Sequence, residues 1–379
     1  MARLRPLEHT LNTRLGEVPY SKKLSSILVD IPLILSLIVT LVFGLFILYS
    51  ASGQSDLMIT RQGIYVIFGI IFMISIAQLQ TKTYQDMATH LIWVAISLLV
   101  IVLIFPAEGY KTNRWIDLGF ISFQPSEIVR LILPLSIASF LTRKRTRLLL
   151  KDWLIVILAI FVCSFLVIKQ PDLGTSIIII TAGFLPVFLA GFPLFYLFSF
   201  FLIFFLMSPF LWGALKEYQK QRIITLFNPD ADPLGAGWNI SQSKTAIGSG
   251  GISGKGYLEG TQSQLDFIPE SHSDFIFAVL GEEFGFIGIL FLIILYAFIF
   301  YRSLKIALNS KSEFGRVLVG SLTFIFIIYV FINILMVVGI IPVVGVPLPL
   351  ISQGGTSMLI HLLSFGFILS IKRSNYDIN

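Results

Sequence analysis

The chain has 379 residues, of which 56% are hydrophobic and only 13% are charged, and it contains 35 phenylalanines. Soluble domains carry about 25% charged residues, so this composition excludes an ordinary soluble protein and predicts a membrane protein. The formal net charge of +6 is not concentrated in a folded basic domain, which argues against nucleic-acid binding. The single cysteine, Cys163, excludes a disulfide framework and a cysteine-ligated metal site.

Ten apolar segments are predicted to cross the bilayer, because each approaches or exceeds the roughly 17 to 25 residues that a spanning helix needs. In chain order they cover 29–50, 61–79, 86–105, 126–142, 152–169, 174–191, 194–214, 274–301, 317–340 and 354–371. The fourth segment is short and the eighth is long. The predicted fold class is therefore an all-α polytopic membrane protein with ten transmembrane helices.

The orientation follows from the basic residues near the helix ends. Seventeen of the 27 Lys and Arg residues fall on the side that holds both termini, and cytoplasmic loops are the ones enriched in these residues. Both termini are therefore predicted to be cytoplasmic, with the basic flanks against anionic membrane lipid. The predicted organisation is a basic cytoplasmic segment 1–28, helices one to seven within 29–214, a large extracytoplasmic loop 215–273, helices eight to ten within 274–371, and a cytoplasmic tail 372–379.

Two of the outer segments carry charged residues beside apolar runs. Arg114 lies before the fourth helix, and Glu127 and Arg130 follow one helical turn apart, a spacing that allows an ion pair. Two interpretations of that pair remain open: mutual neutralisation inside the bundle, or a fixed cation at Arg130 for an anionic ligand. Asp172 comes at the start of the sixth helix, where the helix dipole favours an acid.

The loop 215–273 is longer than a simple connection requires. Residues 216–227 predict a short amphipathic helix that contains Arg222. The glycine-rich stretch that follows carries Lys244 and Lys255, and glycine clusters allow backbone N–H groups to approach a pyrophosphate closely. A Walker motif is excluded, because the Ser249 and Gly256 positions do not match its pattern.

The stretch PESHSDFIFAVLGEEFG begins the eighth helix and contains an unusual set of titratable residues: Glu270, His272, Asp274, Glu282 and Glu283. One interpretation of Asp274 is structural, since Ser271 to Asp274 has the form of a capping box. The other is functional, because acids within a membrane helix usually face a cavity or a charged partner. The second interpretation predicts that the eighth helix lines a polar cavity opening outward, with Asp274 at its rim.

Glycines and prolines add to that expectation. Gly281 and Gly285 have the four-residue spacing that lets a neighbouring helix approach closely. The segment VPLPLISQGGTS, at 346–357, combines prolines with paired glycines before the tenth helix. Irregular backbone at membrane depth is tolerated where protein buries it or where it borders a cavity. This segment is therefore predicted to form part of the cavity wall.

The segments RWIDLGFISFQPSEIVR, QPDLGTS, AIGSGGISGKG, PESHSDFIFAVLGEEFG and GVPLPLISQGGTS, in this order, resemble the SEDS family of bacterial cell-wall proteins, the RodA/FtsW/SpoVE group. The similarity covers nearly the whole chain, and GTQSQLDFIPESHSDF is most like the RodA branch. Arg130 stands where the family usually has lysine, which keeps the charge but changes its geometry. Gln353 stands where an aromatic or small residue is common.

The resemblance implies a peptidoglycan glycosyltransferase in the bacterial plasma membrane, which polymerises lipid II at the outer face during cell elongation. It also implies a class B penicillin-binding protein as partner, which crosslinks the strands. The family's essential aspartate falls on Asp274, and its basic and acidic positions fall on Arg114, Glu127, Arg130 and Asp172.

This chemistry suits the residues. Asp274 is the expected general base of an inverting displacement, and the leaving pyrophosphate needs cations. The substrate-binding candidates are Arg114, Glu127, Arg130, Asp172, Arg222, Lys244, Lys255, Glu270 and His272. A divalent cation, Mg²⁺ or Mn²⁺, is the one cofactor considered, and no organic cofactor is expected. Two alternatives stay open: a lipid II flippase or transporter, and a non-catalytic scaffold that positions the penicillin-binding protein.

Overall fold

The computed structural model describes residues 30–105, 114–117, 122–143, 148–192, 199, 206–210, 212–213, 217–228, 235–265 and 267–377. Its helices are α2 (Ile31–Ala51), α3 (Asp56–Gln78), α4 (Thr81–Ile104), α5 (Pro125–Arg143), α6 (Leu150–Lys169), α7 (Leu173–Leu189), α9 (Glu217–Phe227), α10 (Ala236–Gly250), α11 (Thr261–Gln264), α12 (Ile276–Leu308), α13 (Glu313–Val337) and α14 (Gly355–Asp377). A two-residue antiparallel pair joins β1 (Ile116–Asp117) to β2 (Ser122–Phe123).

Eight of the described helices are long and apolar enough to cross a membrane, namely α2, α3, α4, α5, α6, α12, α13 and α14. The apolar helix α7 is shorter. These nine helices correspond to nine of the ten predicted segments, while the predicted seventh segment, 194–214, lies largely outside the described residues. Large apolar side chains stay exposed along the helices, as with Trp93 at 66%. Such a surface suits lipid and not water.

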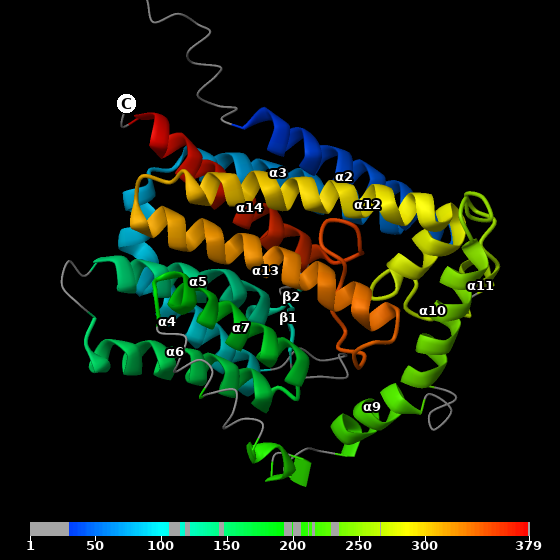
Figure 1. Cartoon of the computed structure of the whole chain (residues 1–379), viewed down its shortest axis with the longest axis horizontal. Coiled ribbons are helices and arrows are strands. Elements are labelled where there is room, and N and C mark those ends of the chain that lie inside the picture. The colour runs from blue at the N-terminus through cyan, green and yellow to red at the C-terminus, as the bar shows by residue number, and fades with distance from the viewer. Residues whose placement is uncertain are drawn as a thin grey trace, which may run out of the picture.

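The long helices lie side by side, and α9, α10 and α11 lie together at the end of the bundle away from the C-terminus (Figure 1). A large buried core joins α2, α3, α12, α13 and α14 with the inner faces of α4, α5 and α7. A smaller core lies within α4, α5, α6 and α7. Because α5 and α7 contribute to both cores and pack against α13, they connect the two halves of the bundle.

The predicted eighth helix is present as α12, but it is broken near its start. Gly285 has φ 61° and ψ −157°, a conformation that side chains disfavour. The N–H of Phe286 donates to the carbonyl of Gly251 at 2.9 Å, and the N–H of Lys255 donates to the carbonyl of Glu282 at 3.0 Å. The turn after α10 therefore satisfies backbone groups that the break releases, as buried backbone requires.

The glycine-rich stretch is helical over α10 and packs tightly on α12. A Cβ at Gly250 would lie 2.0 Å from the carbonyl oxygen of Gly281, and one at Gly254 would lie 2.0 Å from that of Glu283. These glycines allow two backbones to touch, and this packing accounts for them without a pyrophosphate cradle. The close helix approach predicted at Gly281 is confirmed, with α10 as the neighbour.

Candidate active site

A cavity of about 240 Å³ lies between the beginnings of α5, α7 and α14, the turn before α12, and one face of α13. Its lining residues are Arg114, Trp115, Gln124, Glu127, Asp172, Thr175, Ile178, Ser273, Asp274, Tyr329, Gly345, Val346, Pro347, Gln353, Gly354, Gly355, Thr356 and Ser357. Four of the ten predicted site residues meet here, although they come from three distant parts of the sequence: Arg114, Glu127, Asp172 and Asp274.

Asp274 lies in the turn that precedes α12 and not in its first helical turn. The N-cap of α12 is Phe275, with no side-chain cap bond. The Ser271 hydroxyl donates to the carbonyl of Ala51 at 2.9 Å. The capping-box interpretation is therefore wrong, because the N-cap of α12 is Phe275 without a side-chain cap bond, and Asp274 borders the cavity.

Gly345 allows the chain to pass close beside the Asp274 carboxyl group. Its φ is +76°, and a Cβ at this position would lie 3.4 Å from Oδ2 of Asp274. A side chain here would be strained and would occupy space next to the carboxylate. The segment between α13 and α14, whose prolines and glycines predicted a cavity wall, does line the cavity through Gly345–Pro347 and Gln353–Ser357.

Asn333 holds the Asp274 turn against that segment. Its side-chain amide nitrogen donates to the carbonyl of Asp274 at 2.8 Å and to the carbonyl of Val346 at 2.7 Å. Asn333 is fully buried in α13. It is absent from the predicted site residues, although a polar side chain inside an apolar segment is the signal that marks such a position.

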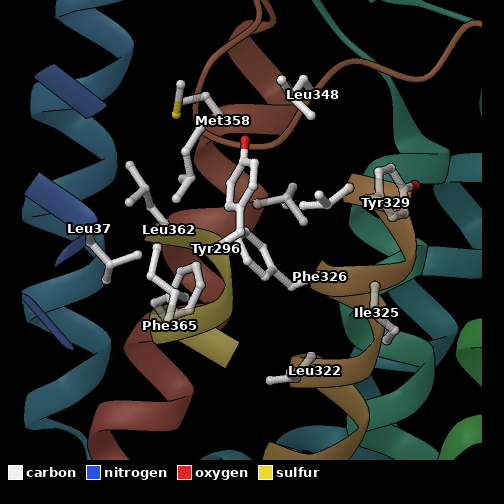
Figure 2. Packing of buried hydrophobic residues seen from close by; sticks show 14 of the residues in the cluster. Leu37, Tyr296, Leu322, Ile325, Phe326, Tyr329, Leu348, Met358, Leu362 and Phe365 are labelled. Atoms are coloured by element: carbon white, nitrogen blue, oxygen red, sulfur yellow. The ribbon is translucent and has the colours of Figure 1, made fainter. Parts of the chain in front are cut away.

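Three further side chains brace the α13–α14 segment. The Ser352 hydroxyl donates to the carbonyl of Ser273 at 2.6 Å, and the Gln62 amide of α3 donates to the carbonyl of Ser352 at 3.1 Å. Tyr296 of α12 is buried with its hydroxyl toward this segment (Figure 2), and it donates to the carbonyl of Pro349 at 2.6 Å. The cavity wall is thus irregular backbone fixed by buried polar side chains, which the sequence did not single out.

Arg114 and Asp172 form an ion pair in the cavity lining. Nη1 of Arg114 lies 3.2 Å from Oδ2 of Asp172, and its Nε donates to the carbonyl of Gln170 at 3.1 Å. Asp172 is the N-cap of α7 and accepts from the N–H of Thr175 at 3.1 Å. Asp172 is therefore a structural cap as well as a cavity residue, and it fixes the half-buried Arg114 in place.

The pair Glu127–Arg130 supports neutralisation inside the bundle. Nη2 of Arg130 lies 2.7 Å from Oε2 of Glu127, and both side chains are buried. The guanidinium carbon of Arg130 lies 4.1 Å from the ring centre of Tyr329. Glu127 and Tyr329 line the cavity and Arg130 does not. Arg130 therefore contacts two cavity-lining side chains and does not itself lie in the cavity wall.

Three other predicted residues, Lys244, Glu270 and His272, lie outside the cavity lining. Lys244 is exposed on α10 beside Gly339. Glu270 is exposed and accepts from the Ser273 hydroxyl at 2.6 Å, and the carbonyl of His272 accepts from the N–H of Gln353 at 3.0 Å. Arg222 belongs to α9, the predicted amphipathic helix, but its side chain is outside the described part of the chain.

Glu282 and Glu283 do not line the Asp274 cavity, which corrects the expectation from their position on the helix. Glu282 pairs with Lys255 at 2.7 Å and accepts from the N–H groups of Gln262 and Ser263 at the start of α11. Glu283 accepts from the Ser50 hydroxyl. Both acids are buried, and they hold the loop after α10 against α12 and α2.

One titratable group in that loop is shifted. The Tyr257 hydroxyl donates to the carbonyl of Phe46 at 3.1 Å, and the two rings stack at 4.0 Å between their centres. Partial burial, with the Glu283 carboxylate nearby, raises the pKa of Tyr257. Tyr257 therefore stays protonated and anchors the loop as a hydrogen-bond donor.

The described residues do not contain a cluster of three His, Cys, Asp or Glu side chains that could hold a metal ion. Near Asp274, the carboxylates of Glu127 and Asp172 are each paired with an arginine. A divalent cation held by protein ligands alone therefore does not fit this part of the chain, since such ions need several oxygen ligands.

An apolar cavity of about 350 Å³ lies between α4, α5 and α6. Its walls include the exposed side chains of Trp93 and Leu158 and the partly buried Phe140. It shares no lining residue with the Asp274 cavity. The two cavities are therefore separate in the structure.

Comparison with known proteins identifies the family of the chain. A family model for FtsW, RodA and SpoVE, described as "Cell cycle protein", matches residues 23–377. The chain is 45% identical to the peptidoglycan glycosyltransferase MrdB of Escherichia coli K12 over 343 residues, which cover 90% of this chain and 93% of MrdB. It is 34% identical to stage V sporulation protein E of Bacillus subtilis, with 91% and 97% covered.

Solved structures share the fold. A chain from a peptidoglycan synthase complex that coordinates polymerization and crosslinking matches with a TM-score of 0.81 and 28% identity, over 92% of this chain and 98% of that chain. The rod shape determining protein RodA of Thermus thermophilus matches with a TM-score of 0.70 and 24% identity, over 92% and 97%. From its motifs, its helices and this likeness along its whole length, the chain belongs to the FtsW/RodA/SpoVE family.

Proposed function

We infer that this chain is a peptidoglycan glycosyltransferase that acts at the Asp274 cavity. The observation that carries this inference is the carboxylate of Asp274 at a cavity that also holds the cationic Arg114, in a chain 45% identical to a peptidoglycan glycosyltransferase. The chain is a multi-pass protein of the bacterial inner membrane.

For the topology, we propose ten spans with both termini in the cytoplasm. The eight long helices and α7 supply nine spans, and 194–214 supplies the remaining one. The excess of Lys and Arg on the side of the termini supports this orientation. It puts the Asp274 cavity at the outer face of the membrane.

The proposed reaction is one inverting displacement. Asp274 takes the proton from the 4-hydroxyl of the acceptor sugar while that oxygen attacks the anomeric carbon of the donor. The bond from this carbon to the lipid pyrophosphate breaks, and the pyrophosphate leaves with the electron pair. A general base must lie within about 2.6–3.2 Å of the proton's oxygen in the reactive complex, and the place of Asp274 in the cavity lining suits this requirement.

The size of the cavity limits which part of the substrate enters. About 240 Å³ is less than the roughly 300–1,000 Å³ of sites that enclose a drug-sized ligand. We therefore propose that only the reacting sugar ends and the pyrophosphate of lipid II enter, while the peptide and the polyprenyl tail stay outside.

Arg114 is the proposed partner of the leaving pyrophosphate. An arginine carries five N–H donors, so it can keep its bonds to Asp172 and to backbone carbonyls and still donate to a phosphate. No step is assigned to a divalent cation, because the described residues do not supply its ligands. Glu127 and Arg130 keep Tyr329 and the start of α5 in place.

We propose a class B penicillin-binding protein as the working partner, and cell elongation as the process. The structural match to a chain from a synthase complex that couples polymerization with crosslinking supports the partner. The identity to MrdB exceeds that to stage V sporulation protein E, which supports the assignment to the RodA branch.

The flippase alternative has less support. A translocation path would need polar groups that are free to exchange partners along the bundle. Instead, Arg130 is paired with Glu127, and Glu282 is paired with Lys255. These titratable groups are therefore already paired, one pair within α5 and the other between α12 and the loop after α10.

The test is Asp274→Asn in the purified full-length protein with lipid II and its partner. We expect loss of glycan product by at least about a hundredfold, the lower end of what a general base contributes. Asp56→Asn, an exposed acid at the same end of the bundle, is the matched control and should retain activity. Full polymerisation by a folded Asp274→Asn protein would rule out the base assignment.

A further inference from the structure

A second polar cavity, of about 850 Å³, lies at the opposite end of the bundle from Asp274. The helix α5 runs between the two, with Glu127 at the Asp274 cavity and Arg143 at this one. Sixteen residues of helix at about 1.5 Å each separate them by roughly 24 Å. The second cavity is therefore not part of the site for glycosyl transfer.

Its lining carries three cationic side chains and one carboxylate, namely Lys82, Arg143, Arg373 and Asp86. Arg143 lies 2.7 Å from Asp86, but the side chains are 41% and 58% exposed. Such exposed pairs are weak, so Arg143 can exchange this partner. Lys82 is exposed, and the cavity has an excess of positive charge.

Two hydrogen-bond donors at this cavity have no partner among the described residues. Nη1 of Arg373 donates to Oε1 of Gln78 at 2.6 Å, which fixes the orientation of the amide. Nε2 of Gln78 and Nε of Arg373 are buried, and no acceptor of the described chain reaches them. Buried polar groups nearly always have a partner. Both groups are donors, so the missing partner is an acceptor.

The start of α4 adds positive potential at the same place. The N-cap of this 24-residue helix is Gln80, which makes no side-chain cap bond, and the first turn holds no acid. Gln80, Thr81 and Lys82 all line the cavity. The N-terminus of a helix carries a partial positive charge and free N–H groups, which favour an anion here.

We propose that this cavity binds a phosphate group. A lipid phosphate is the favoured source, because the cavity lies at the ends of α3, α4, α5 and α14, where membrane-spanning helices meet the headgroup region. A free phosphate or pyrophosphate from solution offers the same chemistry. In the proposed orientation this cavity faces the cytoplasm, so the bound group comes from the inner leaflet or from the cytosol.

The experiment uses the full-length protein and compares Lys82→Gln/Arg143→Gln with Lys305→Gln. Lys305 is an exposed cation at the same end of the bundle that does not line the cavity, so it controls for loss of a cation outside the cavity. In one arm, native mass spectrometry counts phosphatidylglycerol retained from mixed phosphatidylglycerol and phosphatidylcholine nanodiscs. In the other, calorimetry in detergent measures binding of inorganic phosphate and of pyrophosphate.

We expect the double variant to bind phosphatidylglycerol at least about tenfold more weakly than the wild type and Lys305→Gln, which corresponds to about 1.4 kcal/mol. The same loss confined to the detergent arm would identify a soluble phosphate as the ligand. Equal binding by all three proteins in both arms, or equal losses in the double variant and Lys305→Gln, would overturn the proposal. Both altered side chains are exposed, and the single variant Lys82→Gln removes a cation that forms no ion pair with the described residues, so folding is preserved.

Discussion

Replacing Asn333 by leucine tests whether the Asp274 turn must be fixed for polymerisation. The substitution keeps the side-chain volume similar but removes the amide that donates to the carbonyls of Asp274 and Val346. Each buried carbonyl left without a donor costs about 1–3 kcal/mol, so the two together weaken this contact by roughly 2–6 kcal/mol. The Asp274 turn is then free to move away from the α13–α14 segment.

A displacement of about 1 Å in a reacting group reduces catalysis by about a hundredfold. We therefore expect Asn333→Leu to lower kcat for lipid II polymerisation by roughly 10- to 100-fold, with a smaller change in KM, because Arg114 and the rest of the cavity remain. The assay is glycan formation by the purified protein with its partner, together with a thermal unfolding curve to confirm the fold.

Ser321→Ala is the matched control on the same helix. Ser321 is also fully buried in α13, but its hydroxyl donates only to the carbonyl of Val317 one turn earlier, at 2.7 Å. Its loss should change kcat by less than about threefold, since removing a single local hydrogen bond costs about 1 kcal/mol or less. If folded Asn333→Leu polymerises as fast as Ser321→Ala, the two hydrogen bonds of Asn333 have no role in positioning the base.

Three other substitutions separate the site from its scaffold. Gly345→Ala puts a methyl group against the Asp274 carboxylate from a backbone with φ +76°. The kcat should therefore fall at least about tenfold. An unchanged kcat would contradict the close approach of residue 345 to the Asp274 carboxylate. Lys255→Met leaves the buried Glu282 carboxylate without its cation. It should lower the melting temperature and leave kcat per folded molecule unchanged. A lower kcat without loss of stability would instead indicate that Lys255 takes part in the reaction. In Arg114→Lys, the lysine cannot reproduce the bonds to Asp172 and the neighbouring carbonyls. The KM for lipid II should therefore rise several-fold in the polymerisation assay. An unchanged KM would show that Arg114 does not bind the pyrophosphate.

The sequence alone determined the membrane helices and the motifs at their ends. Apolar length predicts a span because the bilayer core requires about 20 apolar residues whatever the neighbours are, and nine of the ten predicted segments correspond to described helices. Acids beside apolar runs also indicated Asp274 and Glu127, since an ionisable group at a membrane boundary needs a specific partner, while Asp172 was added by the family resemblance.

Only the tertiary structure decided which of these groups meet. Asn333 lies 59 residues from Asp274 along the chain, and nothing in the local sequence around either residue indicates their contact. Glu282 follows Asp274 by only two helical turns, yet it binds Lys255 and the start of α11, because α12 is broken at Gly285 and packs there on α10. The direction of a buried side chain depends on which neighbour satisfies it, and that neighbour is set by the packing of the whole bundle.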